Sequence, residues 1–165
     1  MSQMVYVFTS TVIEPPAVVF MGANDDENDR LIEFGSSKYI WFHMSGVSSA
    51  HVYLSLPNGM DIDTIPQALL DDCCQLVKAN SKKGNKMTDA SIVYTPWSNL
   101  SKTERMAVGE VGFHDENAVK MRKVARRINE VVNRLEKTKM KQIVDYRSVK
   151  KQLRNKRDGR EQRNG

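Results

Sequence analysis

The chain has 165 residues, of which 40% are hydrophobic and 27% are charged, and a chain of this length can bury a real core. No apolar run approaches the roughly 18 residues of a membrane span, and no basic segment followed by a long apolar one opens the chain, so neither a membrane helix nor a signal peptide is expected. Residues 1–119 carry 8 Lys and Arg against 15 Asp and Glu, a net charge of −7, whereas residues 120–165 carry 17 against 5, a net charge of +12. An acidic globular part with a basic tail indicates a polyanionic partner for the tail, either nucleic acid or an anionic membrane surface.

The N-terminal third predicts a hairpin and a short helix. Residues 4–10 alternate and are rich in strand formers, Pro15-Pro16 interrupts them, and residues 17–21 form a second short strand. Acidic residues between positions 24 and 29 precede an apolar group and suit the positive end of a short helix. A calcium loop is the alternative interpretation of these acids, but the spacing lacks the bidentate glutamate and the central glycine of such a loop.

The stretch from Tyr39 to Leu56 is the centre of the predicted fold. Two apolar runs, 39–42 and 52–56, predict strands, and the small hydroxyl-rich segment 45–49 between them predicts a turn. His43 and His51 flank this turn. We therefore expect backbone N–H groups, hydroxyls and imidazoles at one end of a sheet.

The next elements are a helix and several strands. Apolar residues at helical spacing predict a helix from Thr64 to about Ser81. Its cysteines, Cys73 and Cys74, are adjacent in the sequence and poorly placed to form a disulfide that would stabilise the fold. We therefore expect them to pack in the core and expect a reducing intracellular compartment, cytoplasmic or nuclear. Strands are expected over 90–95, 108–113 and 117–121, with a loop or helical turn over 98–106.

A long helix is predicted from Val124. Val124, Ile128, Val131 and Leu135 follow a heptad seam that stops after Leu135. We expect the first turns to pack on the domain and the remainder to extend as a basic helix, with Gly159 as the first break. The chain is thus divided into a globular domain over 1–123 and a basic helical extension over 124–165.

The sequence contains no recognisable catalytic set. It has no GxSxG, GxxxxGK[ST] or GxGxxG motif. A metal site formed by His43, His51 and His114 is one interpretation, but histidines at strand ends more often make structural hydrogen bonds. We therefore expect no enzyme activity, no cofactor and no metal.

A binding function accounts better for the charged residues. Four lysines lie at the end of the second predicted helix, where they either complement the helix dipole or contact phosphates: Lys78, Lys82, Lys83 and Lys86. Tyr94 and Trp97 lie near further basic residues in the sequence and either stack bases or complete the core.

Five segments resemble the NFACT-R domain family, in its short eukaryotic branch: YIWFHMSGVSSAHVYLSLP, LVKANSKKGNKM, VYTPWSNLSKT, VGEVGFH and NRLEKTK. The similarity covers roughly residues 4–139. Two groups of residues match the motifs of the family: Trp41, His43, Ser49, His51 and Val52 in the first segment, and Lys102, Thr103, Gly109, Gly112 and Phe113 further along the chain.

The resemblance implies an α+β domain that binds nucleic acid and has no known catalytic role. Together with the predicted elements it gives a mostly antiparallel sheet with packed helices and a long basic C-terminal helix. Longer members of the family engage stalled large ribosomal subunits and tRNA, and the short branch is associated with DNA binding, including DNA at the cell surface. Partners implied by resemblance are therefore DNA or RNA, the ribosome or tRNA, and a cell-membrane association.

Three hypotheses follow. The first is a non-enzymatic nucleic-acid-binding module in which the basic helix and the lysine cluster contact phosphates with low sequence specificity. Its candidate phosphate contacts are Lys78, Lys82, Lys83, Lys86, Lys102, Arg105, Arg122, Lys123, Arg126 and Arg127, and its candidate site loop contains His43, Ser48, Ser49, His51 and Trp97. The second is an adaptor whose C-terminal helix pairs with a helix of a protein partner. The third, a tail that binds anionic membranes, has few bulky apolar residues to support it.

Overall fold

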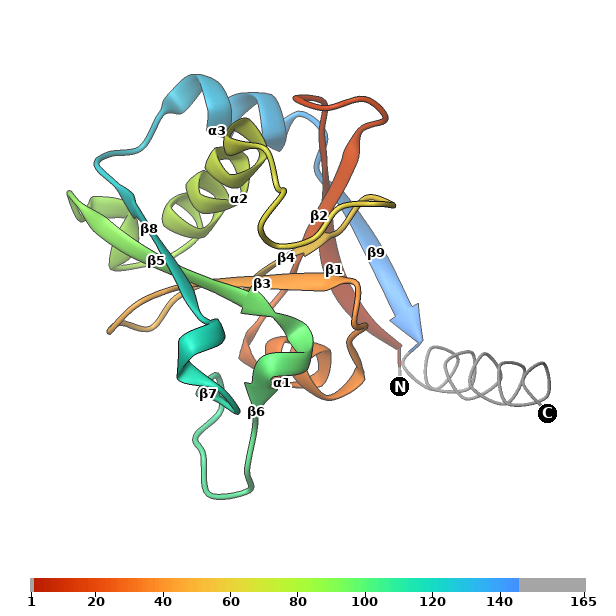
Figure 1. The fold of residues 1–165 in the computed structure, drawn as a ribbon, viewed down its shortest axis with the longest axis vertical. Helices are drawn as coiled ribbons and strands as arrows, with labels where there is room; N and C mark the ends of the chain where they lie inside the picture. The colour runs from red at the N-terminus through yellow and green to blue at the C-terminus, as the bar shows by residue number, and fades with distance from the viewer. Residues whose placement is uncertain (1, 146–165) are drawn as a thin grey trace, which may run out of the picture.

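The computed structural model describes residues 2–145, which form a seven-stranded sheet, a two-stranded sheet and three α-helices (Figure 1). The large sheet has the order β8-β5-β3-β4-β2-β1-β9, and its paired strands are all antiparallel. Its strands are β1 (Ser2–Ser10), β2 (Ala17–Gly22), β3 (Tyr39–Met44), β4 (Val52–Ser55), β5 (Ala90–Pro96), β8 (Lys120–Val124) and β9 (Met140–Asp145). β6 (Leu100–Ser101) pairs with β7 (Gly112–Phe113). The predicted α+β class with a mostly antiparallel sheet is confirmed.

The central strands are buried on both faces because helices cover both sides of the sheet. The helices are α1 (Asp25–Phe34), α2 (Gln67–Ala79) and α3 (Asn129–Glu136), with single 3-10 turns η1 (Gly84–Lys86), η2 (Trp97–Asn99) and η3 (Glu116–Ala118). Ile40 and Phe42 of β3 pack in the core beneath α2, whereas Trp41 packs with Leu31 and Ile32 of α1 in a second core. Figure 1 shows α2 and α3 together at the top and α1 with β6 and β7 at the bottom.

α1 begins as its sequence predicts, whereas α2 begins at Gln67 rather than at the predicted Thr64, with Pro66 at its N-cap, and ends at Ala79. The Asn24 side chain accepts from the Glu27 N–H at 3.0 Å and caps α1, and three acids occupy its first turn. Cys73 and Cys74 of α2 are buried free thiols, which confirms their packing role, and burial raises the pKa of Cys74 to about 12. No helix within residues 2–145 is both long and apolar enough to cross a membrane.

The prediction of one long helix from Val124 is wrong over residues 124–145. Val124 is the last residue of β8, and α3 has only eight residues. Thr138 follows it, donates to the Leu135 carbonyl and accepts from the Thr9 N–H at 2.9 Å, so the chain turns back to β1. β9 then pairs with β1 from Val7↔Met140 to Ser2↔Asp145. The predicted basic helix beyond Asp145 lies outside the described residues.

Two of the weaker strand predictions are also corrected. The strand expected over 108–113 is reduced to Gly112–Phe113, because residues 102–110 form a loop. The strand expected over 117–121 begins at Lys120, after η3, and runs to Val124, where it pairs with β5.

Candidate nucleic-acid interface

The predicted turn between β3 and β4 is fastened to the end of α2. The Ser49 hydroxyl accepts from the Met44 N–H at 3.0 Å and donates to the Ala50 carbonyl at 2.8 Å. The Ala50 N–H in turn donates to the Ser81 hydroxyl at 3.0 Å. Ser48, after the tight turn at residues 45–46, is exposed. The turn is therefore held in one position, with Ser48 facing outward.

His51 is a buried structural residue. The Trp41 indole N–H donates to His51 Nδ1 at 3.0 Å, so the ring proton resides on Nε2, which donates to the Gly109 carbonyl at 3.2 Å. The pKa of His51 is lowered to about 3, mainly by burial and also by the nearby His43 and Lys102, against the opposing effect of the Gly109 contact. The ring is therefore neutral and joins β3 and β4 to the 102–110 loop.

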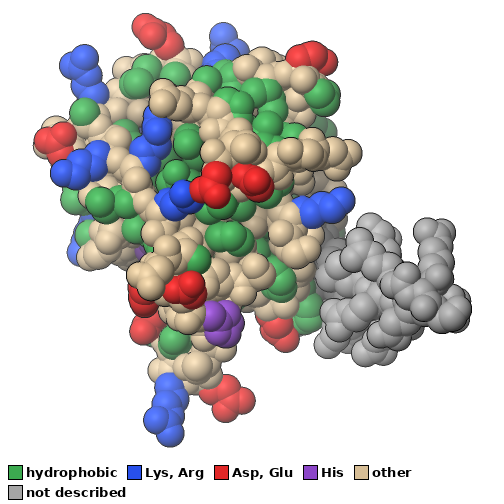
Figure 2. Space-filling view, viewed as in Figure 1, with side chains coloured by type: hydrophobic (Ala, Val, Ile, Leu, Met, Phe, Trp, Pro, Cys, Tyr) green, Lys and Arg blue, Asp and Glu red, His purple; other side chains and the backbone are tan. Residues whose placement is uncertain are grey.

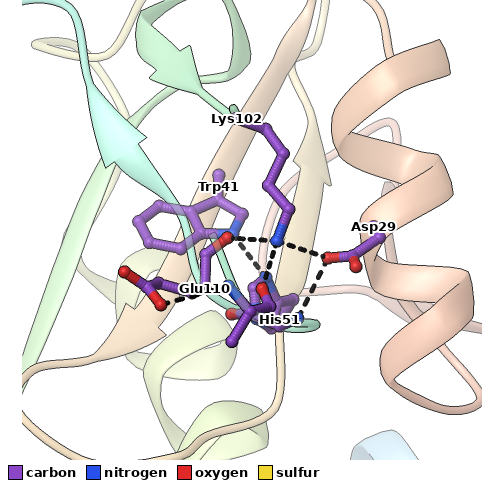
Figure 3. Close-up of polar contacts among 7 residues, drawn as sticks. Asp29, Trp41, His51, Lys102 and Glu110 are labelled. Atoms are coloured by element: carbon purple, nitrogen blue, oxygen red, sulfur yellow. Dashed lines mark hydrogen bonds and ion pairs between the residues drawn. The ribbon is translucent and has the colours of Figure 1, made fainter. Parts of the chain in front are cut away.

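Lys102 fixes the same loop from the other side, as Figure 3 shows. Its ammonium donates to the Ala107 carbonyl and, at 2.6 Å, to the Glu110 carbonyl, and it lies 3.3 Å from Asp29 Oδ1. Asp29 Oδ1 also accepts from the Gly109 N–H at 3.0 Å. Gly109 has a φ of +83°, which favours glycine. The structure thus gives Lys102 a loop-anchoring role that differs from the predicted phosphate contact.

His43 borders an open cleft of about 620 Å³, which we call the His43 cleft. The His43 ring stacks on Trp41, with centroids 5.2 Å apart and planes inclined by 13°. Burial lowers the pKa of His43. The apolar wall of the cleft includes Val47, Val93, Val108, Val111 and Phe113, and its acidic residues are Asp25, Glu110 and Glu116.

A second open cleft, of about 680 Å³, gathers lysines and is called the lysine cleft. Lys82 and Lys83 come from the turn after α2, and Lys139 comes from the residue before β9. The two clefts share Asp25, Ser48 and Ser49, so they are adjacent. Sequence reasoning missed Lys139, because its contribution depends on the return of the chain to β1; the break of the apolar seam at Thr138 was the available signal.

Lys78 has a structural role that differs from the predicted phosphate contact. Its side chain is 1% exposed, and its ammonium donates to the carbonyls of Gly84, Asn85 and Met87. Burial lowers its pKa, and Arg127 lowers it further. Because these bonds close the turn that follows α2, Lys78 holds the segment that carries Lys82 and Lys83.

The remaining predicted cations are distributed over the surface. A hollow of about 580 Å³ beside β8, the β8 hollow, is lined by Lys123, Arg126 and Arg127. Figure 2 shows Lys and Arg side chains gathered on the side of the molecule that carries β8 and α3. Arg122 is paired with Asp71 at 2.6 Å. Lys86 is exposed at the end of η1, and Arg105 is exposed on the 102–110 loop.

Tyr94 and Trp97 serve the core. Tyr94 is 8% exposed and stacks on Phe42, with centroids 5.2 Å apart. The Trp97 indole N–H donates to the Leu31 and Ile32 carbonyls, each at 3.0 Å. Within the described residues, no group of three or more His, Cys, Asp or Glu side chains is placed to hold a metal ion.

Comparison with known proteins identifies the family. The family model described as "NFACT protein RNA binding domain" matches residues 4–115. Coiled-coil domain-containing protein 25 from Danio rerio is 52% identical over 147 residues, and the Bos taurus protein of that name is 49% identical over 148; each match covers 89% of this chain and 71% of the relative. A solved structure titled as the C-terminal of the fibronectin/fibrinogen-binding protein from Streptococcus suis has a similar fold, with a TM-score of 0.63 and 17% identity over 81% of this chain and 48% of that one. The chain belongs to the NFACT RNA-binding domain family and is similar, over most of its length, to coiled-coil domain-containing protein 25.

Proposed function

We propose that the protein is a non-enzymatic nucleic-acid-binding module that holds the sugar–phosphate backbone in the lysine cleft. Membership of a family described as RNA-binding domains supports nucleic acid as the general class of ligand. The net charge of +5 is compatible with a polyanionic partner. The choice between RNA and DNA, and an association with tRNA, ribosomes or DNA sensing, are finer proposals that follow only from the resemblance.

One observation carries the proposal: three lysines from two distant segments of the chain converge on one hollow. Lys82, Lys83 and Lys139 are all exposed there. The Lys139 ammonium lies 4.4 Å from the centre of the Tyr6 ring, and its ion pair with Glu136 is long, at 3.8 Å. Lysine ammonium groups that are not held by short bonds can neutralise phosphates and release counterions.

The same cleft offers neutral donors beside the lysines. Ser48 and Asn80 also line it; the Asn80 amide donates one N–H to the Leu76 carbonyl at 2.9 Å and has a second N–H to donate. Contacts from lysines, hydroxyls and amides to phosphate fix the position of a strand without reading its sequence. The β8 hollow is a second basic surface and would extend the path of a longer strand.

The adaptor alternative is less well supported over the helix that the structure describes. Val132 and Leu135 of α3 are 1% and 0% exposed, so the apolar side of this helix is already covered by the domain. A partner helix would therefore have to displace α3 or pair with a different segment.

Fluorescence anisotropy of the full chain with single-stranded RNA, tRNA and duplex DNA between 50 and 200 mM salt tests the proposal. For single strands, each lysine that contacts a phosphate contributes about 0.7 to the slope of log affinity against log salt. Substituting glutamine for Lys82, Lys83 and Lys139 together should therefore reduce the loss of affinity over this salt range by a factor of about 20.

Lys38→Gln is the matched control, because this exposed lysine precedes β3 at the end away from the 45–51 turn. It should leave the slope unchanged. An unchanged slope in the triple variant would place the interface elsewhere, and no binding to any of the ligands at 50 mM salt would reject nucleic acid as the ligand.

A further inference from the structure

We propose that the His43 cleft binds an unpaired nucleobase of the strand whose phosphate lies in the lysine cleft, and that it favours bases with an exocyclic amino group. This inference rests on the proposed function and specifies the ligand as single-stranded nucleic acid. The occupant of the cleft is a base stacked on the outer side of His43, with its amino group directed to the acidic rim.

The first support is an aromatic stack that ends in the cleft. Trp41 and His43 lie two residues apart on β3, so they share one face of the sheet. Trp41 is 1% exposed, whereas His43 is half-buried and borders the cleft. His51 contacts His43 edge-on, with centroids 4.7 Å apart, and limits its movement. A base placed on the uncovered part of His43 continues the stack, in the manner of single-strand-binding proteins.

The second support is the chemistry of the cleft. Its valines form an apolar wall, and its volume of about 620 Å³ falls within the rough range of 300–1,000 Å³ for ligand sites. Within the described residues the Glu116 carboxylate has no hydrogen-bond or ion-pair partner, and Glu110 uses one carboxylate oxygen for a 3.3 Å contact with the Ala107 N–H. Carboxylates accept hydrogen bonds from exocyclic amino groups, such as the N4 amino group of cytosine. The carbonyl oxygen that uracil carries at that position would be repelled.

The third support is that the two clefts are adjacent and differ in charge. They share Ser48, Ser49 and Asp25, so the 45–51 turn and the first residue of α1 form the boundary between them, and Glu110 and Glu116 lie on the side of the His43 cleft alone. Carboxylates on the rim of the His43 cleft repel phosphate, whereas the lysines on the other side attract it. This arrangement directs the backbone to the lysine cleft and leaves the base as the part of a nucleotide that suits the His43 cleft.

The test is anisotropy with three labelled 12-nucleotide RNAs of equal charge: a cytidine oligomer, a uridine oligomer and an abasic oligomer. The full chain should bind the cytidine oligomer most tightly, with an affinity about 10-fold above that for the abasic oligomer. His43→Ala should reduce cytidine binding to the abasic level. Glu116→Gln should reduce the ratio of the affinity for the cytidine oligomer to that for the uridine oligomer. The glutamine amide can donate to the uracil carbonyl oxygen, which the carboxylate repels.

His114→Ala is the matched control, because His114 is exposed and does not line the cleft. It should leave all three affinities unchanged. Equal binding of the three oligomers by the wild-type chain would overturn the base site while the phosphate site stands, whereas no binding at all would overturn both. If circular dichroism shows that His43→Ala is unfolded, the cytidine-to-uridine ratio of Glu116→Gln decides: an unchanged ratio rejects the proposal.

Discussion

Lowering the pH from 7.5 to 5 should destabilise the fold through His51, which is 1% exposed. Burial lowers the pKa of His51 to about 3 in the folded protein, whereas an unfolded histidine has a pKa of about 6.5. Below about pH 6.5 the unfolded chain therefore binds a proton that the folded chain does not, so the free energy of unfolding falls with pH. The stabilising contribution of neutral His51 is fully present above about pH 6.5 and is lost progressively as the pH falls towards about 3. At pH 5 the loss is about 2 kcal/mol, from roughly 1.5 pH units at about 1.4 kcal/mol each.

Urea unfolding followed by tryptophan fluorescence at constant ionic strength measures this effect. His51→Gln removes the titrating ring but keeps one acceptor and one donor for Trp41 and Gly109. Between the two pH values the wild type should lose about 2 kcal/mol more than His51→Gln. The exposed His114→Gln variant should follow the wild type. Equal losses in the wild type and in His51→Gln would refute the assignment of the pH dependence to this ring.

Two further substitutions test the buried polar contacts. Lys78→Met should lower the free energy of unfolding by about 1–3 kcal/mol, because three carbonyls of the 84–87 segment lose their donor; urea unfolding measures the loss, and faster amide exchange confined to that segment distinguishes it from a global defect. Asp72→Asn should lower the free energy of unfolding by about 1–3 kcal/mol, since the buried carboxylate accepts from the Ser10 hydroxyl and from Nη1 and Nη2 of Arg134. An unfolding midpoint within error of the wild type would contradict either interpretation.

The central strands could be predicted because each is a short, nearly continuous run of apolar residues in the sequence. Residues 39–42 and 52–56 are almost continuously apolar, as strands covered on both faces must be. The role of His51 was not predictable in detail. Its partner carbonyl belongs to Gly109, 58 residues away, and only the folded 102–110 loop brings that carbonyl to the ring.

The C-terminal prediction failed because non-local pairing overrode a local pattern. The seam from Val124 to Leu135 suggested one helix, but Val124 is buried as part of β8 and only the later positions belong to α3. β9 is an edge strand whose sequence, MKQIVD, does not alternate polar and apolar residues and so carries no local strand signal. Its partner, β1, lies at the other end of the chain.

The basic residues illustrate a limit of charge counting, because a cation that already holds the fold contributes less to a phosphate contact. Four of the predicted cations are bonded within the protein: Lys78, Lys102, Arg122 and Arg127. The lysine cleft retains Lys82 and Lys83 and adds Lys139. Three such contacts give a slope of log affinity against log salt of about −2 for a single strand. This slope is much shallower than the one that contacts from all ten predicted cations would give. A steeper measured slope would therefore require further contacts, and the β8 hollow is the described surface whose cations are grouped closely enough to supply them.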